Sequence, residues 1–189
     1  EGASYVQLDA PSYSNFFDRS RRQVLQQSGI DLDAALDAAL AADNAMIAGI
    51  KREPHVVIGI HFCRGNKRSA WGAEGSYEPI AEKAFGSLEM DRYLLEFDSE
   101  RAGGFEPLRF VPKGKTVVLG LITTKEPQLE SEDELLRRID MASHHVAMED
   151  LALSTQCGFA SAASGNLISW DDMRRKLELV ARVARRAWG

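Results

Sequence analysis

The side chains best suited to chemistry in this sequence are a histidine and two cysteines, each close to the end of a predicted strand. His61 and Cys63 follow the apolar run 56–60, and Cys157 follows a second predicted strand, 150–154. Because side chains alternate between the two faces of a β-strand, residues two apart point the same way. One imidazole and two thiolates make a ligand set that zinc favours. The spacing therefore predicts a zinc site that uses both cysteines of the chain.

The elements that would position these side chains alternate between strands and helices. Continuous apolar runs are typical of strands buried on both faces, and apolar residues at helical spacing predict amphipathic helices. The predicted strands cover residues 5–8, 56–60, 92–97, 116–122 and 150–154. The predicted helices cover about 32–50, 77–85, 131–146 and 169–187. We expect Ser131 and Glu134 to form a capping box at the third helix, and Ser169 to cap the last.

Strands separated by helices predict an α/β fold with a parallel sheet and crossover helices. Such folds place their chemistry at the carboxyl ends of the strands. Polar residues occur at these ends: Asp9, His61 with Cys63, Glu96, Thr123 and Cys157. A TIM barrel, (β/α)8, has eight strands, and five are predicted here. We therefore expect a single domain over residues 1–189 that corresponds to the C-terminal five βα units of such a barrel, with the other strands lost from a fragment or supplied from elsewhere.

The composition argues against several classes of protein. The net charge of −5 and the absence of a basic cluster interleaved with aromatic residues argue against nucleic-acid binding. No apolar run approaches the ~20 residues of a membrane-spanning helix, and no signal peptide is visible. Two cysteines in such a chain suit the reducing cytoplasm and indicate ligands or buried thiols rather than a disulfide. We expect a cytoplasmic protein with small-molecule partners and no nucleic-acid or membrane partner.

Five short motifs, taken in order, make the chain resemble a known family. They are Tyr-Val-Gln-Leu-Asp at 5–9, His-Phe-Cys-Arg-Gly-Asn at 61–66, Leu-Leu-Glu-Phe-Asp at 94–98, Gly-Leu-Ile-Thr-Thr-Lys at 120–125 and Gln-Cys-Gly-Phe at 156–159. The chain resembles the C-terminal barrel of cobalamin-independent methionine synthase (5-methyltetrahydropteroyltriglutamate–homocysteine methyltransferase), and more closely the short, single-barrel branch of that superfamily. Each motif alone is weak, whereas all of them in the family order are fairly specific.

The resemblance implies a zinc site made of His61, Cys63, Glu96 and Cys157. A thiol substrate is mostly protonated at neutral pH, and zinc coordination deprotonates it while keeping it nucleophilic. A carboxylate is the weakest donor of the set. Glu96 is therefore the ligand expected to yield its position to the substrate sulfur, because a catalytic zinc needs an exchangeable position.

Taken singly, these residues have structural alternatives. Cys157 alone resembles a buried small apolar side chain, and His61 a hydrogen-bonded structural histidine. Glu96 has Arg64 and Arg92 as potential ion-pair partners. Joint placement at three strand ends, in the family order, favours the metal site over these alternatives.

The resemblance also assigns residues that bind substrate. Asp9 matches the aspartate that receives the amino group of homocysteine. This chain has Asp-Ala-Pro where the family usually has Asp-Glu-Pro, and the alternative is a turn aspartate before Pro11. Arg64 and Asn66 flank Gly65 in a tight loop after the ligand strand. We expect both to bind substrate, Arg64 through an anionic group, with a surface ion pair as its alternative.

The sequence departs from the family at the general acid. Methionine synthases have a histidine after the penultimate strand to protonate the departing folate nitrogen, whereas residues 122–125 here are Ile-Thr-Thr-Lys. Lys125 is the catalytic candidate in its place, provided that burial or neighbouring charge lowers its pKa. Asp98 is predicted to act at the same mouth, or to pair with Arg101. Trp71 either covers an aromatic donor or fills the core.

The leading hypothesis is a zinc-dependent methyltransferase that moves a methyl group, by default from 5-methyltetrahydrofolate, to homocysteine to form methionine. Alkyl transfer to another thiol, as in epoxyalkane:coenzyme M transferases, is an alternative. A second alternative is an incomplete, non-catalytic chain that completes a barrel with a partner chain or in a homo-oligomer, because an open sheet edge favours association. A uroporphyrinogen-decarboxylase-like enzyme is disfavoured, because that chemistry uses no metal.

Overall fold

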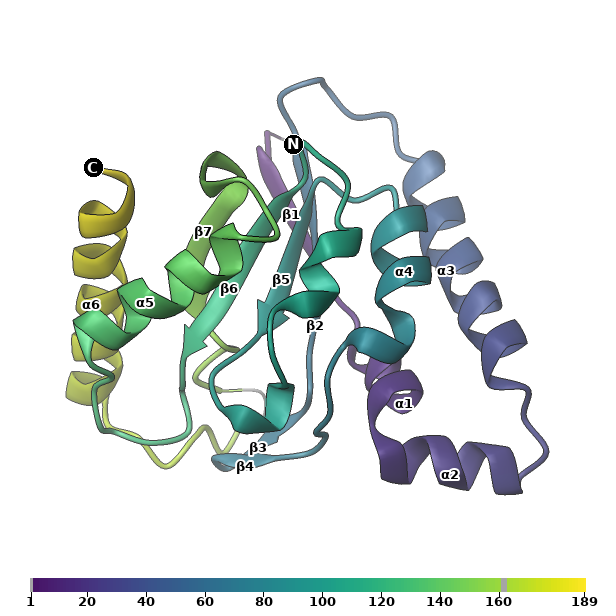
Figure 1. Ribbon diagram of the computed structural model, residues 1–189, viewed down its shortest axis with the longest axis horizontal. Coiled ribbons are helices and arrows are strands. Elements are labelled where there is room, and N and C mark those ends of the chain that lie inside the picture. The colour runs from purple at the N-terminus through teal and green to yellow at the C-terminus, as the bar shows by residue number, and fades with distance from the viewer. Residues whose placement is uncertain (1, 161–162) are drawn as a thin grey trace.

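A five-stranded parallel sheet forms the centre of the computed structural model, which describes residues 2–160 and 163–189 (Figure 1). The strands are β1 (Tyr5–Asp9), β2 (Val57–Phe62), β5 (Arg92–Glu96), β6 (Thr116–Ile122) and β7 (Leu151–Thr155). They lie side by side in the order β1-β2-β5-β6-β7, and each neighbouring pair is parallel. The apolar runs therefore predicted every strand of this sheet, and the bounds of β6 are those predicted.

The four predicted helices are confirmed, and two short helices and a ribbon were not predicted. The described helices are α1 (Ser14–Phe17), α2 (Arg19–Gln27), α3 (Leu32–Ala48), α4 (Glu78–Ser87), α5 (Glu132–Ser143) and α6 (Trp170–Trp188). The first two escape prediction because α1 is one turn long and α2 buries none of its residues. An antiparallel ribbon of β3 (Asn66–Lys67) and β4 (Ala70–Trp71) lies beyond the arrowheads of β5 and β6 in Figure 1. No helix in the described part of the chain has the length and apolarity to cross a membrane.

Short 3-10 helices complete the described elements. They are η1 (Pro11–Tyr13), η2 (Glu100–Ala102), η3 (Glu106–Phe110) and η4 (Met148–Asp150). The first follows β1 at the carboxyl edge of the sheet, and the second follows β5 at the same edge. Both therefore lie in loops that can shape a site at the strand ends.

The sheet is wound in one direction. The strands follow one another across the sheet in sequence order. Crossover connections between parallel strands are right-handed, so the connections between these strands all lie on the same face of the sheet. In β2, the residues on that face are Ile58, Ile60 and Phe62, all buried in the apolar core. The intervening residues point to the opposite face. There a pocket of about 200 Å³ is lined by His61 and Gln156, among others.

The described strands form an open sheet, so a closed TIM barrel is not shown. Within residues 2–160 and 163–189, β1 pairs with β2 alone and β7 pairs with β6 alone. Tyr5 and Val6 of β1 are each 40% exposed. The structure confirms the α/β class and the parallel sheet, while barrel closure depends on strands beyond the five described.

The predicted caps are confirmed at both helices, but one capping box is not. Ser131 accepts a hydrogen bond from the backbone N–H of Glu134 at the start of α5, and Ser169 accepts one from Asp172 at α6. The Asp172 carboxylate in turn accepts a hydrogen bond from the backbone N–H of Ser169, which completes the box at α6. Glu134 instead binds the guanidinium of Arg137 at 2.6 and 2.8 Å. An ion pair one turn along the helix has taken the carboxylate that a capping box needs.

Candidate metal centre

Four potential metal ligands from three strand ends meet at the carboxyl edge of the sheet. His61 lies in β2, Cys63 just beyond it, Glu96 ends β5, and Cys157 follows β7. Their ligand atoms all lie within 4.8 Å of one another. The two Sγ atoms are 3.8 Å apart, and Nε2 of His61 is 3.7 Å from Oε1 of Glu96. Two thiolates bound at about 2.3 Å to one tetrahedral ion would lie about 3.8 Å apart, so this spacing fits zinc.

His61 is oriented to offer one nitrogen to the cluster. Its Nδ1 lies 3.2 Å from the carbonyl oxygen of Leu94, an acceptor that favours a proton on Nδ1. Nε2 is then the free lone pair; it lies 3.7 Å from Oε1 of Glu96 and interacts with the Cys157 thiol, but no group among the described residues reaches good hydrogen-bond geometry with this buried atom. A buried polar atom without a partner destabilises the fold. A metal ion would satisfy it, which is the second feature of the site that fits a metal.

Glu96 is held in place by three hydrogen bonds. Oε1 accepts the backbone N–H of Arg64 at 2.6 Å, and Oε2 accepts Nη2 of Arg101 at 3.0 Å and Nε2 of Gln156 at 3.3 Å. The side chain is fully buried. Its ion-pair partner is thus Arg101, and neither the Arg64 nor the Arg92 side chain fills that role. Burial raises the pKa of Glu96, and the Arg64 backbone N–H opposes that rise.

The two thiols reinforce each other's protonated form. The hydrogen bond between them, followed by burial, raises the pKa of Cys63 far above its ordinary value. The backbone N–H of Gly65 lies 3.4 Å from Sγ of Cys63 and acts in the opposite sense. The two cysteines are not joined in a disulfide. A cation bound between them would reverse the pKa shift, because it stabilises the thiolates directly.

Gln156 supports the cluster and was not identified from the sequence. It is almost fully buried, and besides its bond to Glu96 its Oε1 accepts the backbone N–H and the hydroxyl of Thr124 at 3.0 and 2.7 Å. Every one of these contacts ties the end of β7 to the loop after β6 or to the end of β5. The signal available in the sequence was a polar residue next to Cys157, but neither of its partners was visible there.

Gly120 lets the end of β7 approach the centre of the sheet. A Cβ atom at this position would lie 2.8 Å from Cα of Gln156 and 2.9 Å from the carbonyl oxygen of Leu95. Both are backbone neighbours that move only with their strands. The ladder between β6 and β7 is also irregular here, with a register shift between Gly120 and Ile122. Small size at Gly120 therefore helps to set where Cys157 lies.

Replacing Gly120 with alanine is expected to displace the end of β7 and weaken metal binding. Overpacking of this kind costs about 1–3 kcal/mol, measurable as a lower free energy of unfolding in urea. Gly86→Ala is the matched control, since Gly86 lies in α4 with nothing within 4 Å of the added Cβ. That variant should be as stable as the parent or more so. Equal stability and equal zinc affinity of both variants would contradict this role for Gly120.

Asp9 lies beside the cluster, as expected. It is opposite His61 in the register of β1 and β2, and paired positions of neighbouring strands point to the same face. Burial raises the pKa of Asp9, the charge of His61 lowers it and the charge of Cys157 raises it. The following 3-10 helix is capped by Ala10 without a side-chain hydrogen bond, so Asp9 is not its capping residue.

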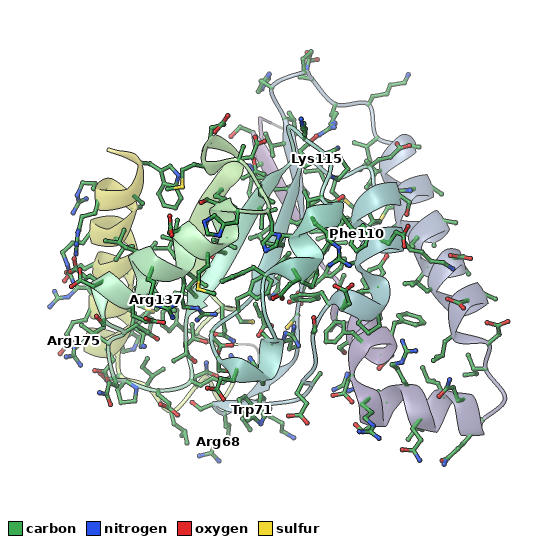
Figure 2. All side chains as sticks on the ribbon, viewed as in Figure 1. Arg68, Trp71, Phe110, Lys115, Arg137 and Arg175 are labelled. Atoms are coloured by element: carbon green, nitrogen blue, oxygen red, sulfur yellow. The ribbon has the colours of Figure 1, made fainter. Side chains whose placement is uncertain are left out.

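Asp98 and Lys125 come together at a second pocket, of about 320 Å³, that Trp71 also lines. Asp98 lines this mouth and also forms the expected pair with Arg101, whose Nη2 it binds at 3.1 Å. Burial, followed by the positive charge of Arg101, lowers the pKa of Lys125, which is the condition set for a general acid at this position. Trp71 is 54% exposed, so it does not fill the core. Figure 2 labels it on the ribbon beyond the carboxyl ends of the strands.

The structure places Arg64 and Asn66 away from an open substrate site. Arg64 is fully buried, with its guanidinium carbon 4.6 Å from the ring centroid of Phe17 and 4.3 Å from that of Tyr77. It is therefore neither a surface ion pair nor a side chain that an anionic substrate can reach without displacing the rings. Asn66 is buried and donates to the carbonyl oxygen of Gly158 at 3.2 Å. Its contact fastens the loop after β2 to the Cys157 loop.

The fold and the ligand set together define the class: an α/β protein with an imidazole, two thiols and a carboxylate gathered at the carboxyl edge of a parallel sheet. The sequence signature described as "Cobalamin-independent synthase, Catalytic domain" matches residues 1–186. The chain therefore belongs to the cobalamin-independent methionine synthase family, as its motifs had indicated.

Individual relatives agree with this assignment. The uncharacterized protein YxjH of Bacillus subtilis is 40% identical over 188 residues, which are 99% of this chain and 49% of that protein. A methionine synthase of Pyrococcus abyssi is 26% identical over 159 residues, covering 83% of this chain and 37% of that one. A solved structure from Listeria monocytogenes, described as a proposed vitamin-B12-independent methionine synthase, is 33% identical with a TM-score of 0.76 and covers 100% of this chain and 49% of its own. The chain spans about half the length of the Bacillus and Listeria proteins that it matches.

Proposed function

We propose that this chain carries the zinc-binding part of an enzyme that alkylates a thiol, with methyl transfer to homocysteine, forming methionine, as the default reaction. The observation that carries the proposal is the convergence of four ligand atoms within 4.8 Å, two of them sulfurs at the spacing of a shared tetrahedral ion. His61, Cys63, Glu96 and Cys157 would hold zinc. When bound, zinc supplies a positive charge that lowers the pKa of a thiol substrate to the physiological range.

Glu96 is suited to exchange its position with the substrate sulfur. Its Oε2 is bound by Arg101 and Gln156, and Oε1 by the backbone N–H of Arg64. These donors would still satisfy the carboxylate after it left a metal, so leaving exposes no bare buried charge. The same donors keep it close enough to return.

Asp9 is proposed to bind the substrate ammonium. Its carboxylate lies at the mouth of the sheet, next to the cluster, where a charge-assisted hydrogen bond would orient an amino acid thiol. We expect Asp9→Asn to weaken homocysteine binding about 10- to 100-fold, the equivalent of roughly 1.5–3 kcal/mol for a hydrogen bond to a charged group. Calorimetric titration of the zinc-loaded protein measures this loss.

4-Mercaptobutanoate, which is homocysteine without its amino group, provides the control ligand. Asp9→Asn should leave its affinity unchanged. A variant that weakened both thiols to the same degree would show that Asp9 supports the site in some other way than by binding the ammonium.

Lys125 and Asp98 are proposed to handle the leaving group. Both line the pocket next to the cluster, and Arg101 joins the two regions because its Nη2 binds both Glu96 and Asp98. Lys125 would donate its proton to the departing atom of the alkyl donor. An epoxide or another activated alkyl group remains the alternative donor, and a sulfonate thiol the alternative acceptor.

We propose that further strands complete a TIM barrel around this sheet. The strands are wound in one direction, both edge strands lack a second partner in the described part of the chain, and the relatives are about twice as long. The strands would come from a longer chain, a complementing chain or a homo-oligomer. Two thiols that lie close together without forming a disulfide suit a reducing compartment such as the cytoplasm.

The proposed thiol activation has a direct test in proton release. A thiol that binds zinc as a thiolate releases about one proton per site, which calorimetry in buffers of different ionisation enthalpy detects. We expect release on adding homocysteine to zinc-loaded protein and none to the zinc-free form. Binding without proton release, for homocysteine and for 2-mercaptoethanesulfonate alike, would favour the non-catalytic alternative.

A further inference from the structure

One side chain joins three of the loops at the carboxyl edge of the sheet. Asn166 lies in the segment between β7 and α6. Its Nδ2 donates to the carbonyl oxygen of Thr124, in the loop after β6, at 2.8 Å. Its Oδ1 accepts the backbone N–H of Ser69, in the turn between β3 and β4, at 3.3 Å. Its own backbone N–H donates to the carbonyl oxygen of Phe159, in the loop after β7, at 3.0 Å.

The turn of the β3–β4 ribbon needs support from outside the ribbon. Arg68 and Ser69 form this turn, and their φ angles are positive, 47° and 65° (Figure 2 labels Arg68). Such angles suit glycine or asparagine better than residues with other side chains, and they persist where neighbouring groups hold them. The backbone N–H of Leu167 also donates to the hydroxyl of Ser69, at 2.8 Å. Two hydrogen bonds through Ser69 therefore tie the ribbon to the segment before α6.

Thr124 connects Asn166 to the proposed metal ligand Glu96. The backbone N–H and the hydroxyl of Thr124 both donate to Oε1 of Gln156, at 3.0 and 2.7 Å. Nε2 of Gln156 donates in turn to Oε2 of Glu96 at 3.3 Å. Thr124 and Gln156 are both buried, so solvent does not replace these partners. The position of Thr124 therefore sets the orientation of the Gln156 amide that holds Glu96.

We propose that Asn166 is a positioning residue that couples the β3–β4 ribbon to Glu96. It holds the turn of the ribbon through Ser69, and it holds the Gln156 amide through Thr124. A movement of the ribbon would thus change how firmly Glu96 is held, and a metal ion on Glu96 would steady the ribbon, because coupling between two sites is reciprocal. The effect on a metal rests on the proposed function, whereas the hydrogen bonds from Ser69 to Glu96 do not.

Asn44 provides the matched control. Its Nδ2 donates to the carbonyl oxygen of Ser87 at 2.7 Å, and its Oδ1 accepts the backbone N–H of Glu89 at 2.9 Å. These are the two kinds of hydrogen bond that the Asn166 side chain also forms, but they join α3 to the end of α4. Asn44→Ala and Asn166→Ala should both lower the melting temperature. Only Asn166→Ala should change the carboxyl edge of the sheet.

The side-chain amide of Gln156 reports on these hydrogen bonds without any metal. Its NH₂ signals in the ¹⁵N spectrum of the zinc-free protein are identified by their loss in Gln156→Leu. We expect Asn166→Ala to shift these signals and to speed hydrogen exchange of the Thr124 amide about tenfold, because local opening there becomes easier. Asn44→Ala should leave both unchanged. Unmoved Gln156 signals in a folded Asn166→Ala would overturn the proposal.

Hydrogen exchange of the ribbon, with and without zinc, tests the coupling itself. In the parent protein, zinc should slow exchange of the Ser69 and Leu167 amides. Asn166→Ala should lose this effect and bind zinc about tenfold more weakly, as expected when a residue that supports a metal ligand is lost. Asn44→Ala should behave like the parent in both respects.

The outcomes separate the coupling from the proposed function. Zinc that binds the parent protein but protects the Ser69 amide equally in the parent and in Asn166→Ala would overturn the coupling. The same holds for zinc that leaves this amide unprotected in both. A parent protein that binds no zinc would overturn the proposed function alone, and the Gln156 signals of the zinc-free protein would then decide the role of Asn166.

Discussion

Replacing Cys157 with serine is expected to lower the zinc affinity about 100-fold or more. Structural zinc sites have binding free energies of about 10–16 kcal/mol shared by four ligands, and on that scale losing one strong ligand costs roughly 3 kcal/mol. Sγ of Cys157 lies 3.8 Å from Sγ of Cys63, and both belong to the cluster whose atoms lie within 4.8 Å. Competition with a chromophoric chelator measures the affinity directly.

His144→Ala is the control for this prediction. His144 caps the C-terminal end of α5 and is exposed. Its loss should leave the zinc content near one ion per chain and the affinity unchanged. If Cys157→Ser bound zinc as tightly as the parent and His144→Ala, the cluster would not be the metal site.

Replacing Arg101 with methionine is expected to produce the largest loss of stability. Its side chain is almost fully buried, and Nη2 binds Glu96 at 3.0 Å and Asp98 at 3.1 Å. The guanidinium also donates to the carbonyl oxygen of Ala73 at 3.2 Å and packs on Trp71. Methionine would leave two buried carboxylates without their cation, which costs about 3–5 kcal/mol. Urea unfolding of the metal-free protein measures this change without interference from zinc.

The same substitution should also weaken zinc binding about 10- to 100-fold, because Arg101 orients a ligand without touching the metal. Arg137→Met is the matched control. Arg137 forms an exposed ion pair with Glu134, and such pairs contribute about 0–1 kcal/mol. Similar losses of stability in the two variants would show that the Arg101 network carries no special role.

The sequence predicts the sheet from short-range patterns, and it predicts the candidate metal ligands from the spacing of His61 and Cys63 together with the family resemblance. The runs around Val57 and Val117 are apolar without interruption, as buried parallel strands require. The spacing of His61 and Cys63 places both on one face of a strand, whatever the rest of the fold does. Glu96 and Cys157 also lie at the carboxyl ends of predicted strands, and in a parallel sheet these ends share one edge.

The supporting residues were harder to predict because their partners are distant in sequence. Arg101 was expected beside Asp98, but its bond to Glu96 depends on how the loop after β5 folds back. Arg64 was predicted to bind an anionic group of the substrate because it follows Cys63. It is buried instead against Phe17, which belongs to the unpredicted helix α1. Gln156 stood in a family motif next to Cys157, but nothing in the sequence indicated that its side chain bonds to Glu96 and Thr124.

Zinc K-edge absorption spectroscopy, before and after adding homocysteine, tests the central claim most directly. The zinc-loaded chain should show two sulfur ligands at about 2.3 Å and two nitrogen or oxygen ligands at about 2.0–2.2 Å. Homocysteine should add a third sulfur and remove one oxygen, as Glu96 gives up its place. A zinc shell with no sulfur from the protein would contradict the account, because Cys63 and Cys157 would then not share an ion.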